Sequence, residues 1–305
     1  MRTFQEYLDK KRQEINSHIK LIVENKISDP DVILTLLKGK RMRAGLLLLV
    51  FDAVSDRDRD ISGALDLACA IELAHSASLI LDDMLDGDKE RRGQPAAHLT
   101  RGHKRAILDV MDILSLPYDI AAHYGELYVH MLAETQRGMV SGVVNELFHA
   151  SNLQSAEIYD AIITQKTGRL FRLAAMWGCL AARSGGQGIS GEMRPYEKEI
   201  ASFAEYGLGC GKAMQIADDI VDLKKVIDGN KSGLPGPGLL LPGCLNTGIN
   251  SLLDKEIARS RRTISSINVP YAYREMLLDV PSGIVNMMLG EYWLKREFGE
   301  VCQSE

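Results

Sequence analysis

Residues 61–88 have the sequence ISGALDLACAIELAHSASLILDDMLDGD. Small and apolar residues fill almost every position before the aspartates, so a helix formed by this stretch is apolar on nearly all of its sides. Such a helix needs other helices around it, which predicts that it lies inside a helical bundle. The stretch ends in the pattern Asp-Asp-x-x-Asp, at Asp82, Asp83 and Asp86.

The same aspartate pattern recurs at Asp218, Asp219 and Asp222, within QIADDIVD. On a helix, the first and last carboxylates of each pattern share a face, and the middle one lies about 100° around the axis. Like charges on one helical turn repel each other, and a divalent cation offsets this repulsion. Mg²⁺ prefers a few carboxylates together with substrate phosphates. The sequence therefore predicts magnesium at both patterns.

The composition is that of a soluble globular protein. The chain has 305 residues, of which 46% are hydrophobic and 25% charged, with a net charge of −5. Nucleic-acid binders carry a basic excess, so the main partner is not expected to be nucleic acid. No apolar run reaches the roughly 20 residues that span a membrane, and the N-terminal stretch is charged throughout. Together with five scattered cysteines, these features predict a cytoplasmic protein without a transmembrane segment.

Helical periodicity dominates the chain, and strict two-residue alternation is absent, which predicts an all-α fold without a sheet. Besides an N-terminal helix and the helix at 61–85, helices are expected at 30–37, 42–54, 104–114, 117–150, 155–184, 194–228, 245–267 and 281–297. The Gly-rich stretch 183–191 and the Gly- and Pro-rich stretch 228–243 are expected loops, and the second is either a flap over the site or a plain connection. Neither separates regions of different composition, so residues 1–305 are expected to form one domain.

Several side chains near the aspartates could hold an anion. They are Lys40, Arg43, His75, Arg91, Arg92, Lys166, Thr167 and Gln215. Lys40 and Arg43 share a helical face, and His75 lies two helical turns before Asp82. Arginines can grip phosphate oxygens bidentately while the aspartates hold the metal. Each also has a structural interpretation, as a solvated basic patch, a core histidine or a surface ion pair.

Taken together, these motifs resemble the trans-isoprenyl diphosphate synthases of the polyprenyl synthetase family. The resemblance is carried, in order, by GKRMR (39–43), HSASLILDDMLD (75–86), RRGQP (91–95), KTG (166–168) and QIADDIVD (215–222). It implies a single-domain bundle of long helices around a deep central cavity, in a homodimer. It also implies an enzyme that joins an allylic diphosphate to isopentenyl diphosphate, head to tail, with about three Mg²⁺ ions per active site.

The resemblance also implies a role for each residue. Asp82, Asp86 and Asp218 would ligate Mg²⁺, supported by Asp83, Asp219 and Asp222. The allylic diphosphate would meet Arg91, Lys166, Thr167 and Gln215, and isopentenyl diphosphate would meet Lys40, Arg43, His75 and Arg92. The family usually carries two further lysines after the second motif. Here Lys231 stands in for the first, and the second is missing.

In this family, the residue five positions before the first motif often limits product length, and short-chain enzymes tend to have an aromatic ring there. This chain has Ala77, followed by Ser78. On a helix, Ala77 lies about 7.5 Å deeper than Asp82. The resemblance therefore implies a long product, geranylgeranyl diphosphate first and longer chains next. Bulky residues elsewhere, such as Tyr128, His130 or Met131, would form the floor of the cavity.

Three other functions remain open from the sequence. A terpene cyclase is also an all-helical ionising enzyme, but it usually carries a distinct Asn/Ser/Glu motif in place of the second aspartate motif. A non-catalytic subunit of a heteromeric synthase typically loses an aspartate motif, whereas both are present here. A helical scaffold with acidic faces would leave the basic side chains unexplained.

Overall fold

The computed structural model describes residues 2–55, 60–91, 93–149, 156–184, 194–227 and 248–290. Apart from one short hairpin, its regular elements are helices, which confirms the all-α fold. The contacts within the chain group it into two compact units. The first-motif unit, which holds Asp82, comprises Glu6–Glu134 and Leu173–Ala201; the second-motif unit, which holds Asp218, comprises Met1–Gln5, Thr135–Arg172 and Ser202–Glu305. A single domain around a central cavity stays a prediction.

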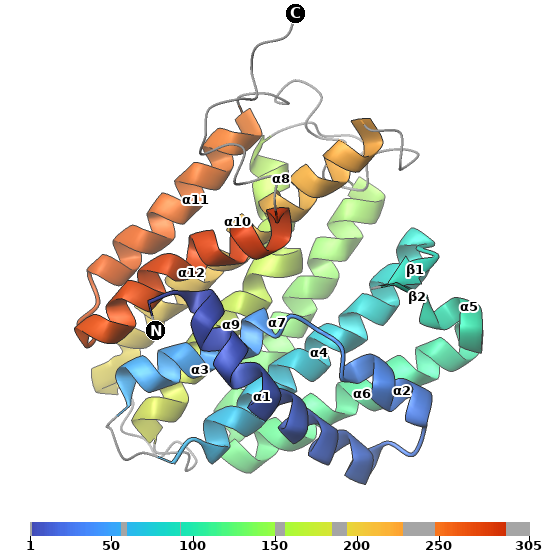
Figure 1. The fold of residues 1–305 in the computed structure, drawn as a ribbon. Helices are drawn as coiled ribbons and strands as arrows, with labels where there is room; N and C mark the ends of the chain where they lie inside the picture. Colours follow the sequence, from blue (N-terminus) through green and yellow to red (C-terminus); the bar gives the residue numbers. More distant parts are fainter. Residues whose placement is uncertain are drawn as a thin grey trace, which may run out of the picture. The chain divides into compact units, whose positions relative to one another are not determined.

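The first-motif unit is built around one central helix. Its elements, wholly or for the most part, are α1 (Phe4–Lys26), α2 (Pro30–Leu36), α3 (Met42–Val54), α4 (Ser62–Asp86), β1 (Glu90–Arg91), β2 (Gln94–Pro95), α5 (Ala97–Arg101), α6 (His103–Tyr124), α9 (Arg169–Ser184) and the 3₁₀ turn η4 (Arg194–Tyr196). α4 packs against α3, α5 and α6, as Figure 1 shows. This arrangement confirms that the apolar stretch at 61–85 forms a core helix.

α4 presents the first aspartate motif at its C-terminal end. Most of the helix is buried, although by length and composition it could also cross a membrane. Buried core helices of soluble proteins have the same length and hydropathy. The helix ends at Gly87, whose left-handed conformation (φ 67°) suits glycine and lets the last amide bond back to a helix carbonyl. The chain therefore turns directly after Asp86.

Glu72 of α4 anchors the start of α3. The N-terminal amides of a helix need acceptors, and Arg41, the residue before α3, supplies none from its side chain. Glu72 supplies one, because its Oε1 accepts the amide of Ala44 (3.1 Å). Its Oε2 lies 3.5 Å from the Arg41 guanidinium, which also donates to the carbonyl of Leu36 (2.8 Å). These bonds hold Arg41 in a left-handed conformation (φ 60°), which is rare for a residue other than glycine.

Glu72→Ala should destabilise the protein by about 3–5 kcal/mol, because it leaves the buried Arg41 guanidinium without its counter-charge. Arg41 and Glu72 are only 1% and 3% exposed. Urea unfolding followed by circular dichroism measures the loss. Glu24→Ala is the control, because Glu24 pairs with Lys20 on the surface of α1 and should contribute less than about 1 kcal/mol. Equal losses in the two variants would refute the anchoring role of Glu72.

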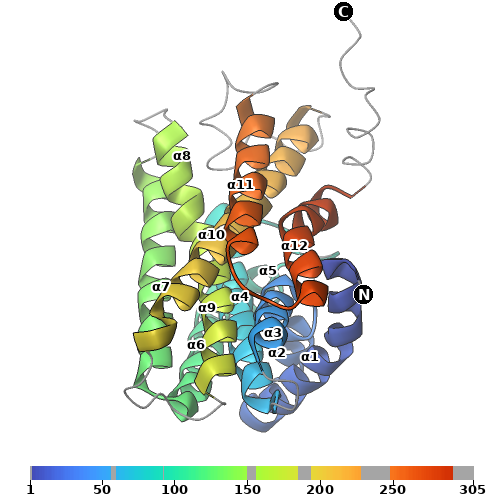
Figure 2. The ribbon, with the colours of Figure 1, turned by 90° about the vertical axis from the view of Figure 1, so that its left-hand side faces the viewer.

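The second-motif unit contains α7 (Glu126–Val144), the π-helical turn η1 (Asn145–His149), α8 (Ala156–Ile163), the π-helical turn η3 (Thr164–Gly168), α10 (Glu197–Ile227), α11 (Gly248–Ser265) and α12 (Tyr271–Leu289), wholly or for the most part. α11 packs along α12, which is visible in Figure 2. Apolar residues of α8, α10, α11 and α12 form one buried cluster that includes Tyr159, Ile216, Leu253 and Val285. This cluster fixes the face on which α10 carries Gln215 and the second motif.

Two prolines that were expected to begin helices lie inside them. α6 continues through Pro117 and ends only before Gly125, whose φ of 113° is unfavourable for other residues. α12 begins at Tyr271 and continues through Pro281. A proline costs a helix one hydrogen bond, but both rings are buried in well-packed helices, and this packing offsets the loss. The expected helix starts at residues 117 and 281 were therefore wrong.

Candidate functional site: two aspartate motifs and their donors

The first aspartate motif carries three carboxylates in different environments. Asp83 is buried, Asp82 is half-buried and Asp86 is exposed. Asp83 Oδ1 accepts two hydrogen bonds from Arg91, of which the Nε bond measures 2.6 Å. Burial raises the pKa of the Asp83 carboxyl above its ordinary value, and the hydrogen bonds from Arg91 oppose this rise. Asp83 thus holds Arg91 close to the motif, while Asp82 and Asp86 remain more accessible.

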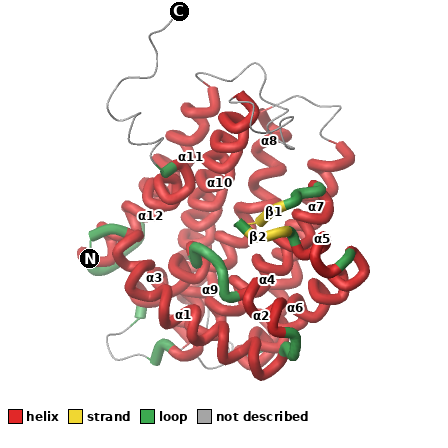
Figure 3. The backbone as a smooth tube through the Cα atoms, turned by 45° about the vertical axis from the view of Figure 1, so that its right-hand side comes forward, coloured by secondary structure: helices red, strands yellow, loops and turns green. Residues whose placement is uncertain are grey.

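A hairpin that the sequence did not predict positions Arg91. β1 and β2 pair in antiparallel register, with Arg91 opposite Gln94, and Figure 3 shows the two strands in yellow beside α5. Gly93 makes the turn with φ 73°, a conformation that glycine adopts at little cost. Each strand has only two residues, too few to show a two-residue periodicity. The expectation of no sheet was therefore wrong in this detail.

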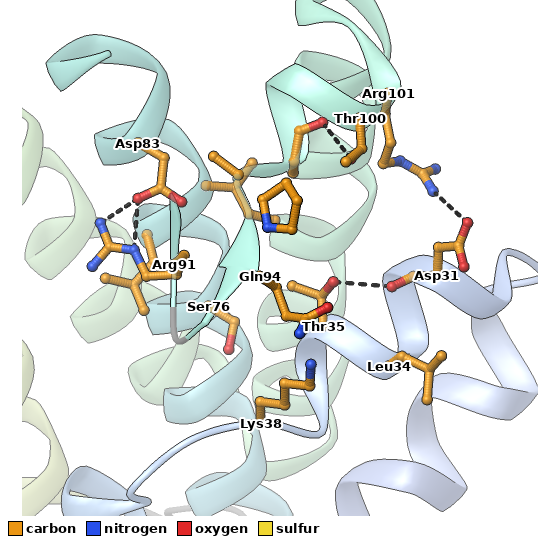
Figure 4. A pocket seen from close by; sticks show the side chains of 15 residues that line it. Asp31, Leu34, Thr35, Lys38, Ser76, Asp83, Arg91, Gln94, Thr100 and Arg101 are labelled. Atoms are coloured by element: carbon orange, nitrogen blue, oxygen red, sulfur yellow. Dashed lines mark hydrogen bonds and ion pairs between the residues drawn. The ribbon is translucent and has the colours of Figure 1, made fainter. Parts of the chain in front are cut away.

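A cavity of about 370 Å³ lies beside the Asp83–Arg91 pair. Figure 4 shows Asp83 and Arg91 on one side of the cavity and Lys38, between α2 and α3, pointing into it from below. Ser76 and Gln94 add polar groups, whereas apolar side chains of α2, α4 and β2 complete the lining. The cavity is of a size and mixed polarity suited to a small ligand.

An ion-pair network borders this cavity and fixes α2 to α5 and α6. Arg101 donates to Asp29 (2.6 Å) and to Asp109 (2.8 Å), and Arg105 reaches the same two carboxylates. The hydrogen bond from Arg101 holds the pKa of Asp29 well below its usual range. Asp29 also caps α2 by accepting the amide of Asp31, which confirms the expected start of that helix.

The residues assigned to isopentenyl diphosphate lie around the start of α3 and on α4. Lys40 is exposed directly before α3, Arg43 is buried in its first turn, and His75 is half-buried on α4. Arg92 lies outside the residues that the structure describes. Ala77 is fully buried, and Ser78 donates its hydroxyl proton to the carbonyl of His75 (2.8 Å).

In the second motif, the middle aspartate is again the buried one. Asp219 Oδ2 accepts the Tyr159 hydroxyl (2.6 Å), and Oδ1 accepts Gln215 Nε2 (3.0 Å). Gln215 Oε1 in turn accepts the Thr167 hydroxyl (2.5 Å). Burial raises the pKa of Asp219 to about 7, and the bonds from Tyr159 and Gln215 limit that rise. Asp218 and Asp222 are half-buried on either side.

The KTG segment forms a π-helical turn, η3, between α8 and α9. π turns interrupt a regular helix and often lie at functional sites. Lys166 forms an ion pair with Glu146 of η1 (2.7 Å). Gly211 of α10 approaches Gly168 so closely that a side chain at Gly211 would meet the backbone of η3 at 2.9 Å. The two glycines let α10 lie close enough for Thr167 to reach Gln215.

The two motifs share one arrangement: protein donors hold the middle aspartate, while the outer two are more accessible. Within the described ranges, no three His, Cys, Asp or Glu side chains converge closely enough to hold a metal by themselves. This donor set fits Mg²⁺, which commonly takes one or two carboxylates plus substrate phosphates. Each motif is described within its own unit, so the meeting of all six carboxylates around one cavity stays a prediction.

Sequence reasoning singled out Thr167, Gln215 and the second motif, and the structure places these close together. It missed Tyr159 and Glu146. Tyr159 lies seven residues before Lys166, so its place shortly before the KTG segment was visible in the sequence. The hydrogen bond from Tyr159 to Asp219 could not be predicted from the sequence, because that bond depends on how α8 packs against α10. Lys231 and the stretch 228–243 lie outside the described residues.

Residues 25–231 match the Polyprenyl synthetase family, and this match covers both aspartate motifs. The chain belongs to the polyprenyl synthetase family. A geranylgeranyl diphosphate synthase from Pseudescherichia vulneris is 32% identical over 231 residues, 69% of this chain and 70% of that protein. A geranylfarnesyl diphosphate synthase from Methanosarcina mazei is 33% identical over 195 residues, 64% of this chain and 61% of that protein. The relatives are prenyltransferases, the enzyme class that the sequence predicted.

Solved structures of polyprenyl synthetases have the same fold. A geranyltranstransferase from Methanosarcina mazei superposes with a TM-score of 0.68 at 26% identity, over 94% of this chain and 97% of that one. A polyprenyl synthase from Caulobacter crescentus, complexed with calcium and isoprenyl diphosphate, gives a TM-score of 0.72 at 21% identity, over 93% and 98%. This agreement confirms the isoprenoid-synthase type of all-α fold.

Proposed function

We propose that this polyprenyl synthetase joins an allylic diphosphate to isopentenyl diphosphate, head to tail, to make geranylgeranyl diphosphate or a longer chain. The observation that carries the proposal is the arrangement of the second motif. There Asp218 and Asp222 flank a donor-held Asp219, and Gln215 and Thr167 lie within one hydrogen-bonded group. This group combines carboxylates for a cation with donors for a diphosphate, the two requirements of an ionising prenyltransferase.

The first step breaks the allylic C–O bond, and the bonding electrons leave with the diphosphate. Cationic and hydroxyl donors stabilise the negative charge that develops on the leaving group. Arg91, Lys166, Thr167 and Gln215 serve this role. Lys166 pairs with Glu146 in the protein alone, so the incoming diphosphate competes with that carboxylate for the lysine. Asp82, Asp86 and Asp218 would hold Mg²⁺, about three ions per site by family resemblance, and the metal would add positive charge near the leaving diphosphate.

The second step forms a carbon–carbon bond and loses a proton. Lys40, Arg43, His75 and Arg92 hold isopentenyl diphosphate, whose double bond attacks the allylic carbocation. The released pyrophosphate takes the proton, so the chain needs no dedicated base. The carbocation must be kept from water, and we infer that the face of α4 with the small buried residues Ala70, Ala74 and Ala77 borders it.

We also propose a homodimer located in the cytoplasm. α6 exposes three large apolar side chains within about one and a half turns, Ile107 (46%), Leu108 (61%) and Met111 (65%). An apolar stripe of this kind on a surface helix commonly marks a protein interface. A second copy of the chain is the occupant that the family suggests. Light scattering of the purified protein should give the mass of two chains, and a single-chain mass would refute the dimer.

The purified chain, incubated with Mg²⁺, radiolabelled isopentenyl diphosphate and allylic primers of increasing length, tests the proposed activity. The expected products are labelled prenyl diphosphates, sized after dephosphorylation by reversed-phase chromatography. Labelled hydrocarbons, or hydrocarbons formed from the allylic primer alone, would instead indicate a cyclase. A chain that is inactive alone but active after addition of a second protein would be a partner subunit.

A further inference from the structure

We propose that Tyr159 is a positioning residue that orients the second aspartate motif and, through it, the KTG segment. The inference rests on the proposed function, because it names a residue that prepares that site for a diphosphate. Tyr159 comes from α8, Asp219 and Gln215 from α10, and Thr167 from η3. One chain of hydrogen bonds joins these three elements.

The directions of these hydrogen bonds follow from the chemistry of Asp219. In its ionised form Asp219 accepts hydrogen bonds and donates none, so both of its partners are then donors. Tyr159 occupies Oδ2 with its hydroxyl, and Gln215 occupies Oδ1 with its Nε2 group. Because the Nε2 group of Gln215 is turned toward Asp219, its Oε1 atom faces the opposite way. There it accepts the hydroxyl of Thr167.

Because most of these side chains are buried, each hydrogen bond in the chain depends on the one before it. Tyr159 is 2% exposed, Thr167 6% and Asp219 7%, so water cannot readily replace a lost partner. A buried acceptor that loses its donor must turn or find another one. Without the Tyr159 hydroxyl, the Asp219 carboxylate is free to rotate, and the amide of Gln215 is no longer held in one orientation. The Thr167 hydroxyl then loses the acceptor that fixes it.

The position of Tyr159 explains why it acts through its neighbours. It lies in the buried cluster of α8, α10, α11 and α12, where its ring packs against apolar side chains. Its hydroxyl meets Asp219, the motif residue that is least exposed. Comparable outer-shell donors to ligating groups usually change metal affinity or activity by ten- to a hundredfold when they are removed.

Tyr159→Phe removes the hydroxyl and keeps the ring. Isothermal titration with inorganic pyrophosphate in Mg²⁺ buffer measures binding without turnover. We expect the dissociation constant to rise by roughly ten- to a hundredfold. In steady-state kinetics, the KM for the allylic diphosphate should rise similarly, while the KM for isopentenyl diphosphate stays within about twofold, because the residues that hold the latter lie in the first-motif unit.

Tyr206→Phe is the matched control. Tyr206 is a fully buried tyrosine of α10 in the same unit, and its hydroxyl donates to the carbonyl of Leu277 (2.5 Å), away from the motif. It should lose comparable stability but keep the pyrophosphate affinity. Both variants are titrated at a temperature at which circular dichroism shows them folded.

The possible outcomes distinguish a failure of the role proposed for Tyr159 from a failure of the proposed function. If the wild type binds pyrophosphate and Tyr159→Phe binds it within twofold as tightly, Tyr159 has only a packing role and the inference is wrong. If both variants lose affinity equally, the effect is general destabilisation, and the inference is again wrong. If the wild type neither binds pyrophosphate nor forms a prenyl product, the proposed function itself fails.

Discussion

Asp82→Ala should lower kcat by roughly a thousandfold or more while the fold survives. The expected loss is large because Asp82 is the more buried of the two outer carboxylates in the first motif, and its middle neighbour Asp83 is already held by Arg91. Asp86 shares its face but is itself a proposed ligand, so it cannot also replace Asp82. Steady-state assays at saturating Mg²⁺ and both substrates measure kcat.

The fold should survive because the Asp82 side chain is partly exposed and lies near the end of α4. Glu90→Ala is the control: it removes an exposed carboxylate eight residues away and should change kcat by less than about threefold. Thermal unfolding should give similar midpoints for both variants. Unchanged kinetics in Asp82→Ala would reject the metal role of the first motif.

Ala77→Phe should shorten the product to two or three isoprene units. Ala77 lies about 7.5 Å along α4 from Asp82, and in the proposed function the added ring would block a growing prenyl chain there. The same assay as above, with products sized by chromatography, shows the change. The next residues on this face, Ala74 and Ala70, are also small and buried, so no bulky side chain of α4 is expected to stop a longer chain in the wild type.

Ala77 is fully buried, so a large side chain also risks overpacking of the core, at a cost of about 1–3 kcal/mol. The series Ala77→Val, Ala77→Leu and Ala77→Phe separates the two effects. Product length should fall stepwise with side-chain size, whereas overpacking alone would lower the melting temperature and total activity. An unchanged product distribution across the series would place the length limit elsewhere.

The structure bears on which residues could form the floor that limits product length. His130 is exposed, with 65% of its side chain accessible, so it cannot close an apolar cavity. Tyr128 is buried and packs edge-on against Trp177, with 5.5 Å between the ring centroids. Tyr128 therefore fits a buried apolar floor better than His130, and Met131 is half-buried.

Local chemistry determined how much of the fold could be predicted. The bounds of α3 were predicted correctly because Met42–Val54 is a continuous apolar run. The start of α2 was correct because Asp29 and Pro30 are a capping residue and a first-turn proline. Pro117 was misinterpreted because the rule against helix-interior proline is local, whereas the burial that offsets it is tertiary.

In the candidate site, too, some features could be predicted from the sequence and others could not. The aspartates and the KTG segment were recognisable because their spacing follows helical geometry. The hydrogen-bond partners of Asp83 and Asp219 could not be recognised from the sequence. Arg91 reaches Asp83 because of an unforeseen hairpin, and Tyr159 reaches Asp219 across the interface between two helices. Spacing identifies which residues share a face, but contacts between elements decide which of them are already bonded.

The π-helical turn at Thr164–Gly168 has a consequence for how this chain can vary. Such a turn holds one more residue than a regular one, so it shifts the angular phase of everything that follows it along the axis by about 100°. Deleting one residue from this segment would restore a continuous α-helix, which the local helix propensity of the sequence would favour. It would also rotate Phe171 and Leu173 out of the interior, so natural variation here should conserve length more strictly than identity.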